Sequence, residues 1–186
     1  AGCSDSMTEA NNPEQQVPIA FGTQVATRSV VESDKEGMDN FTLWGWVRES
    51  DGPKLFFDAA SVTPSGNYGE KRFWAVGRPY DFFALHPEKM KEEGIAAEVS
   101  CNDKGELRVT GFDSSGMGKD AVDLMTATET DVTYEGGGTM APVLLAFKHE
   151  LAQVKLTVRT GEKLAEVSDI RLFGVDYKGD LLWTDR

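Results

Sequence analysis

The chain has 186 residues, 40% of them hydrophobic and 27% charged, as is ordinary for a globular protein that buries a core. Its 31 acidic and 19 basic residues give a formal net charge of −12, which argues against nucleic acids and anionic lipid surfaces as partners. The two cysteines lie far apart without metal-ligand spacing, which argues against a disulfide framework, and no apolar run is long enough for a transmembrane helix.

The N-terminus carries a short motif of its own. Ala1-Gly2-Cys3 matches the last three residues of a bacterial lipobox, where a signal peptide is cut before a cysteine that receives lipid. The alternative is a chance cysteine, because the apolar run that would precede a lipobox is missing from this sequence. Residues 1–16 are polar, so we expect a tether there, followed by one β-sandwich domain over residues 17–186.

Short β-type runs bounded by glycine, proline, asparagine and aspartate follow along the chain. In residues 17–26, Ile19, Phe21 and Val25 fall on one face of an alternating pattern, which is typical of a strand. Further strands are expected at residues 41–48, 55–62, 71–76, 80–85, 97–101, 106–110, 121–127, 143–159 and 168–175.

One segment, residues 86–94, is a convincing helix candidate, and Gly94 could end it. Helical crossover units between strands are absent from the pattern. The sequence therefore predicts an all-β fold, an antiparallel β-sandwich of the transthyretin-like or Greek-key type with at most one or two short helices.

The sequence from His149 to Gln153, HELAQ, differs in one position from the H-E-x-x-H motif of zinc peptidases. Gln153 stands where the second histidine would be, and His86, the only other histidine, lies in a separate segment. The flanking residues alternate as strands do. We therefore interpret His149 as a structural residue at a strand irregularity, either a bulge or one helical turn, and expect no metal site.

Other catalytic patterns are missing from the sequence. It contains no G-x-S-x-G elbow, P-loop or dinucleotide-binding glycine motif. A buried, inert thiol is the simpler interpretation of Cys101, and nothing selects a catalytic pair among the 31 acidic residues. The sequence predicts a protein that is not an enzyme and uses no cofactor.

The aromatic residues allow two interpretations. Trp44, Trp46 and Trp74, with Tyr68 and Tyr80, could line a platform that contacts sugar rings, or they could pack in the core and across strands. Their β-alternating neighbours favour packing. A glycan-binding module of a surface nutrient-uptake system is kept as the alternative function, with the three tryptophans as candidate contacts.

Several segments together resemble the fimbrillin-like (Mfa-like) family of bacterial surface pilins and pilus-associated lipoproteins. Each motif is degenerate, and it is their order and combination over about residues 17–175 that carries the resemblance. The matching segments are IAFGTQVATR (19–28), FTLWGWV (41–47), YGEKRFWAVGRPYDFFALHP (68–87), DLMTA (123–127) and PVLLAFKHELAQVKLTV (142–158).

The resemblance implies a fimbrial subunit or accessory protein that serves adhesion and is exported to the outer-membrane surface as a lipoprotein anchored through Cys3. It implies other pilus subunits as partners, by β-strand addition, with a host protein or glycan as a candidate ligand. No nucleic acid is expected, and the membrane is contacted only through lipid. Family pilins typically have two β-sandwich domains, of which we expect only the first here.

In polymerising members of the family, a trypsin-like protease cuts after an arginine in the loop that follows the first strand. The strand then leaves, and a strand of a neighbouring subunit fills the groove. The resemblance therefore implies Arg28 as the candidate cleavage site and the strand with Ile19, Phe21 and Val25 as the exchanged one. The alternative is an ordinary loop arginine, since accessory and tip subunits can keep the first strand.

Overall fold

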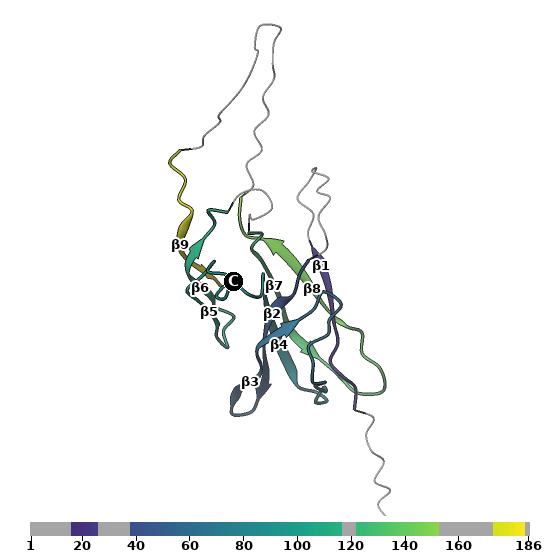
Figure 1. Ribbon diagram of the computed structural model, residues 1–186. Helices are drawn as coiled ribbons and strands as arrows, with labels where there is room; N and C mark the ends of the chain where they lie inside the picture. Colours follow the sequence, from purple (N-terminus) through teal and green to yellow (C-terminus); the bar gives the residue numbers. More distant parts are fainter. Residues whose placement is uncertain (1–15, 26–37, 117–121, 153–172, 185–186) are drawn as a thin grey trace, which may run out of the picture.

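The structure, a computed structural model, describes residues 16–25, 38–116, 122–152 and 173–184 (Figure 1). These residues contain strands and no helix, which confirms the predicted all-β fold. Accordingly, none of the described residues forms a helix that could cross a membrane. The strands are β1 (Phe21–Val25), β2 (Phe41–Glu49), β3 (Gly52–Val62), β4 (Pro79–His86), β5 (Glu98–Cys101), β6 (Leu107–Asp113), β7 (Met125–Thr133), β8 (Val143–His149) and β9 (Lys178–Trp183).

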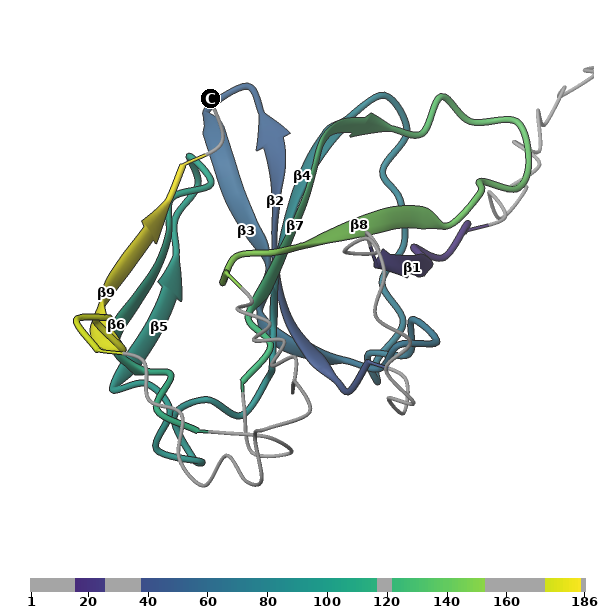
Figure 2. The ribbon, with the colours of Figure 1, turned by 90° about the horizontal axis from the view of Figure 1, so that it is seen from above.

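The strands form two sheets, one with the order β1-β8-β7-β4-β2-β3 and one with the order β5-β6-β9. All pairs are antiparallel except β1 with β8, which is parallel. β8 joins β7 through two residue pairs, Met125 with His149 and Thr126 with Lys148. Beyond that junction β8 diverges from β7 and carries β1 with it (Figure 2).

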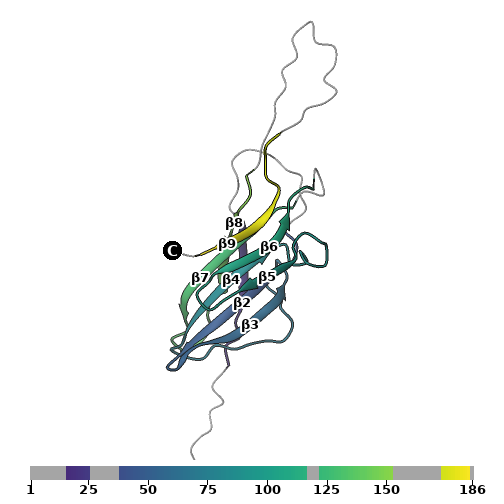
Figure 3. The same ribbon diagram turned by 90° about the vertical axis from the view of Figure 1, so that its left-hand side faces the viewer.

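The divergence of β8 produces three layers (Figure 2). We call β1 and β8 the first layer, the four strands β7, β4, β2 and β3 the central sheet, and β5, β6 and β9 the second layer. Figure 3 shows the second layer in front of the central strands. The two outer layers cover opposite faces of the central sheet, so its middle strands are buried on both sides.

Strands β2 and β4 carry the apolar sequences that such burial requires. β2 is buried from Phe41 to Val47 and β4 from Tyr80 to His86, and a strand covered on both faces needs a nearly continuous apolar run. Alternate side chains enter two separate cores. The first core, toward β1 and β8, includes Ile19, Phe21, Phe41, Leu43, Phe57, Tyr80, Phe82, Leu145 and Phe147. The second core, toward β5, β6 and β9, includes Trp44, Trp46, Phe83, Leu85, Leu107, Val109 and Phe112.

The helix predicted over residues 86–94 is wrong. The segment forms a series of turns, in which the N–H groups of Ile95 and Ala96 both donate to the Met90 carbonyl. Between Pro87 and Gly94 the only apolar side chain is Met90, which is buried in the second core. One apolar anchor does not make the stripe that stabilises an amphipathic helix.

Three strand predictions also need correction. The strand predicted at residues 121–127 is β7, which begins only at Met125 and runs on to Thr133. Residues 71–76 form no strand, since their only bridge pairs Phe73 with Pro18. Within the predicted strand 168–175, the described residues 173–175 are not in a strand, and β9 begins later, at Lys178. The predicted extension of β8 to residue 159 lies mostly outside the described residues.

Candidate functional site: the first strand and its groove

The first strand lies at the edge of the six-stranded sheet, beside β8. The parallel register runs from Phe21 opposite Val143 to Val25 opposite Phe147. Just before the strand, the Val143 N–H donates to the Ala20 carbonyl at 2.7 Å. The two strands are far apart in the sequence, so their pairing is a long-range contact that no local turn enforces.

The loop from β3 to β4 lies along the other side of residues 17–23. The Ile19 N–H donates to the Arg72 carbonyl at 2.8 Å, and the Trp74 N–H donates to the Val17 carbonyl at 3.0 Å. Further along, the Thr23 hydroxyl donates to the Pro64 carbonyl at 3.1 Å. Residues 17–25 are therefore held in a groove between β8 and this loop.

Gly66 lets the loop approach the first strand closely. A Cβ atom at position 66 would lie 2.1 Å from the carbonyl oxygen of Phe21, and the glycine has a φ of +82°. Both the positive φ and the missing side chain are needed here, since other residues rarely adopt this conformation and none could fit against the Phe21 carbonyl.

The side chains of the first strand fill pockets in the first core. Ile19 and Phe21 are only 2% and 4% exposed, as their alternation predicted, while Val25 is partly buried. The Phe21 ring makes edge-on contacts with three aromatic rings, at centroid distances of 5.7, 5.6 and 5.2 Å from Phe57, Tyr68 and Phe82. Such contacts add to the free energy gained by burying the ring.

Tyr68 fixes the first strand in a second way, because its hydroxyl donates to the Ile19 carbonyl at 2.7 Å. This role of the loop was not predicted from the sequence. The available signal was the run from Thr63 to Asn67, which predicts a turn but does not show what the turn packs against.

The groove has the geometry of a site for strand addition. β8 offers a pairing edge, the loop offers main-chain partners, and the pockets accept large apolar side chains at alternate positions. The implied cleavage site Arg28 and the implied lipidation site Cys3 lie outside the described residues.

The three tryptophans considered as glycan contacts are buried. Trp44, Trp46 and Trp74 are 4%, 6% and 7% exposed. The first two lie in the second core, and Trp74 packs edge-on against Tyr80 at a centroid distance of 4.9 Å. Their rings pack within the protein and present no open face on which a sugar could stack.

His149 and Glu150 tie strand ends together. β8 ends at His149, whose Nδ1 lies 2.7 Å from Asp123 Oδ1. The Glu150 carboxylate accepts hydrogen bonds from the Thr126 hydroxyl at 2.5 Å and from Trp183 Nε1 at 2.7 Å, so it links β7 with β9. Within the part of the chain that the structure describes, no group of three potential ligands could hold a metal ion.

Cys101 has no feature of a reactive thiol. Burial raises its pKa to about 12, against which a hydrogen bond to the Asn102 carbonyl has a smaller, opposite effect. A cysteine with this pKa is protonated at neutral pH and is a poor nucleophile.

Comparison with known proteins gives one match. The model of the fimbrillin-like family matches residues 27–185, whereas no curated protein and no solved structure matches significantly. The match begins after β1, so it rests on the central sheet and the regions that follow, independently of the first strand. Because it covers nearly the whole chain, the protein belongs to the fimbrillin-like family, a structural family of pilus-associated cell-surface proteins.

Proposed function

We propose that this fimbrillin-like protein is a lipid-anchored subunit or accessory protein of a fimbria, that residues 17–25 form an exchangeable strand, and that the assembled protein serves adhesion at the outer-membrane surface. The proposal of strand exchange rests mainly on the position of Phe21. Its side chain lies deep in the first core, yet it belongs to a short edge strand paired with β8 alone among the strands described.

Loss of this strand would leave an unpaired strand edge and empty side-chain pockets. The main-chain groups of β8 would lose their partners, and the pockets of Ile19 and Phe21 would be empty. Unpaired strand edges and exposed apolar pockets are both unfavourable in water. A strand from another subunit with large apolar residues at the same spacing would satisfy both, so exchange conserves most of the interaction free energy.

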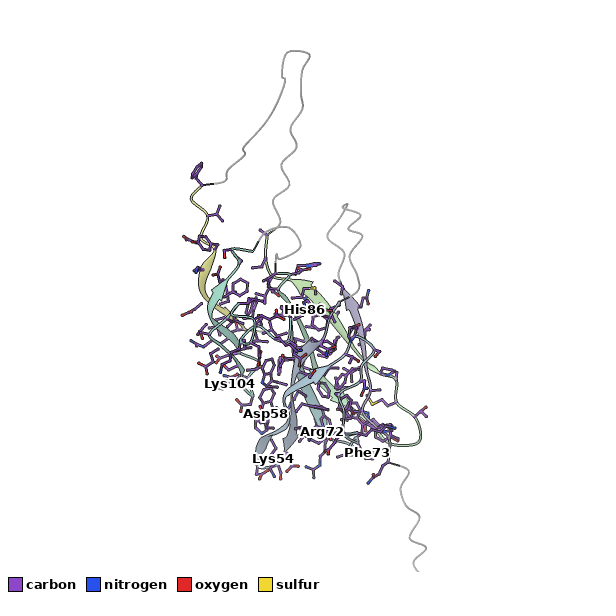
Figure 4. The ribbon with its side chains drawn as sticks, viewed as in Figure 1. Lys54, Asp58, Arg72, Phe73, His86 and Lys104 are labelled. Atoms are coloured by element: carbon purple, nitrogen blue, oxygen red, sulfur yellow. The ribbon has the colours of Figure 1, made fainter. Side chains whose placement is uncertain are left out.

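The opposite edge of the same sheet supports this assignment by contrast. β3 carries Pro53, Lys54 and Asp58, and it bulges at Ala59, whose φ is +45°. Figure 4 shows Lys54 and Asp58 along this strand. Proline, charges and bulges are the features that keep an edge from adding a strand. β1, with the sequence FGTQV, has none of them.

Limited trypsin digestion followed by peptide exchange tests the proposal. We expect cleavage after Arg28 in the wild-type chain but not in Arg28→Gln, the matched control for cuts elsewhere. The cleaved protein should then take up a labelled synthetic peptide of residues 17–28, measured by fluorescence anisotropy. A peptide with Phe21→Ala should bind at least tenfold more weakly, since a lost buried phenylalanine costs well over the roughly 1.4 kcal/mol that this factor represents.

A peptide with Gln24→Ala is the control, because Gln24 is exposed and should contribute little. Equal binding of the Phe21→Ala and wild-type peptides would contradict exchange into this groove. So would a cleaved protein that never takes up peptide, even after mild heating.

The lipid anchor is tested separately. We expect radiolabelled palmitate to enter the precursor when it is produced in a bacterium with its own leader, and labelling to disappear in Cys3→Ala. Undiminished labelling of the variant would exclude Cys3 as the attachment point and would leave the strand exchange unaffected.

A further inference from the structure

Three polar side chains gather where the first layer joins the central sheet. His86 ends β4, Asp123 precedes β7, and His149 ends β8. In the sheet register His86 lies opposite Met125, which in turn lies opposite His149. Figure 4 shows His86 well away from Lys54 and Arg72.

Both histidines contact Asp123. His149 Nδ1 lies 2.7 Å from the Asp123 carboxylate, and His86 Nδ1 lies 3.0 Å from the Asp123 main-chain carbonyl. Since a carbonyl or carboxylate oxygen can only accept, each Nδ1 donates. In the neutral His86 ring Nε2 is then an acceptor, and this buried atom has no hydrogen-bond partner among the residues that the structure describes.

A second proton on His86 would be unfavourable in this environment. Burial is the largest effect and lowers the pKa of His86; Asp123 and Asp39 oppose it, whereas His149 acts in the same direction as burial. Protonation would place a charged N–H group in a buried position where the described residues offer no acceptor, which costs far more than the same event in water.

Because of where this cluster lies, protonation of His86 would affect the junction between β8 and β7. The β8–β7 junction consists of two residue pairs, one of which is Met125 with His149. β8 in turn carries β1. A disturbance at His86 therefore acts on the short ladder that attaches the first layer. The second layer also reaches this place, where Trp183 of β9 donates to Glu150, but it is packed on the central sheet through the whole second core.

We propose that His86, Asp123 and His149 form a proton-sensitive clasp, and that protonation of His86 in mildly acidic solution loosens the junction of β8 with β7 and frees the first layer. The second layer stays folded. In the context of the proposed strand exchange, the clasp would regulate how readily residues 17–25 leave the groove; that consequence rests on the proposed function, whereas the clasp does not.

The direction of the pH effect follows from proton linkage. A histidine whose pKa is lowered by folding binds fewer protons in the native state than in the open state. Its contribution to stability is complete above about pH 6.5, the ordinary histidine value, and falls as the pH drops below it. The chain has two histidines, and histidine is the side chain whose ordinary pKa lies in this range. An effect between about pH 7.5 and about pH 5.5 can therefore be assigned by two substitutions.

Hydrogen–deuterium exchange of the intact chain at these two pH values tests the clasp, with rates corrected for the chemical effect of pH. We expect residues 21–25 and 143–149 to exchange faster at the lower pH, by up to about tenfold, because pH 5.5 lies about one unit below the ordinary histidine pKa and this distance limits the effect. Residues 107–113 of the second layer should be unchanged. His86→Asn keeps a donor for the Asp123 carbonyl but cannot take up a proton, and should abolish the acceleration.

His149→Asn is the matched variant and should retain the acceleration, because His86 is still present. A speed-up that persists in His86→Asn, or one that is equal in both layers, would overturn the proposal. If His86→Asn does not fold, the two imidazole ring-proton resonances of the wild-type protein decide: one must titrate below the ordinary value together with the opening of β8. No peptide or partner enters this experiment, so it can fail while strand exchange holds, and the reverse.

Discussion

The two outer layers cover the same central sheet but are held in different ways. In the second layer, β5 and β6 form a hairpin and β9 pairs with β6 in antiparallel fashion. In the first layer, β1 and β8 are parallel, distant in sequence, and joined to the central sheet by the short β8–β7 ladder. The first layer therefore depends mainly on side-chain packing, and this dependence is what makes its outermost strand exchangeable.

Side-chain hydrogen bonds occur in both outer layers, but they join different partners. The Gly111 N–H donates to Asp180 at 2.8 Å, which joins β6 to β9. The first strand is held by the packing of Phe21 against three aromatic rings. Its side-chain hydrogen bonds, from Tyr68 to the Ile19 carbonyl and from Thr23 to the Pro64 carbonyl, each end on a main-chain carbonyl. Packing of this kind is strong yet transferable, because any strand with a suitable side chain can supply it, whereas specific polar contacts favour the original partner.

Two neighbouring residues of β4 offer the sharpest test of this difference. Phe82 and Phe83 are both buried, the first facing the first core and the second facing the second core. We expect Phe82→Ala and Phe83→Ala each to lower the free energy of unfolding by about 3–5 kcal/mol in urea titrations. Hydrogen exchange should accelerate in β1 and β8 for the first variant and in β5, β6 and β9 for the second.

Leu55→Ala serves as the control, since that side chain is exposed on β3. Identical exchange patterns for the two phenylalanine variants would mean that the layers unfold as one unit. The two layers would then not differ in local stability.

Substitutions at two glycines can separate the effect of packing on stability from the effect of backbone conformation. Gly94 and Gly105 have similar φ values, +71° and +74°, but a Cβ atom at Gly94 meets open space, whereas one at Gly105 would lie 2.4 Å from the Phe83 ring. We expect Gly94→Ala to cost about 1–2 kcal/mol from the positive φ alone. Gly105→Ala should cost about 1–3 kcal/mol more, because the β5–β6 turn packs directly on Phe83.

Thermal unfolding of both variants checks this difference. Equal losses would show that the turn can move away from Phe83 freely, and that the second layer is less tightly packed on the central sheet than the distances indicate.

The sequence predicted most of the central sheet, because aromatic and β-branched residues dominate β2 and β4 and leave little choice of structure. It also predicted the inward face of the first strand, since Ile19 and Phe21 follow a period of two. The sequence could not predict which strands pair with each other. Nothing in FGTQV shows that it pairs with β8 in parallel, because the pairing depends on contacts far along the chain.

The errors at residues 71–76 and 86–94 share a physical cause. In both, the structure uses a single buried anchor, Trp74 in the first core and Met90 in the second, where the sequence pattern had predicted a regular element. Two main-chain hydrogen bonds of residues 71–76 go to Val17 and Ile19. For the candidate site, the sequence suggested the strand but not its groove, since the loop residues Gly66 and Tyr68 act through tertiary contacts.

The smallest expected effect concerns the exposed ion pair of the second layer, in which Lys178 Nζ lies 2.8 Å from Asp113 Oδ2 between β9 and β6. This contact, helped by hydrogen bonds from Ser115, lowers the pKa of Asp113 to about 2. Because the pKa is lowered, the associated stability is present above the ordinary value of 3.8 and is lost as the pH falls toward about 2.

We expect Lys178→Gln to raise the pKa of Asp113 only part of the way, since the Ser115 N–H still donates to it at 2.9 Å. Carboxyl-carbon NMR titration measures the change, and Lys104→Gln, at the other end of β6, should leave the pKa alone. At neutral pH the unfolding midpoint of Lys178→Gln should hardly move, because exposed pairs are well screened by water. A large drop would mean that charge, and not the second core, holds β9 to β6, and the contrast between the layers would need to be redrawn on that basis.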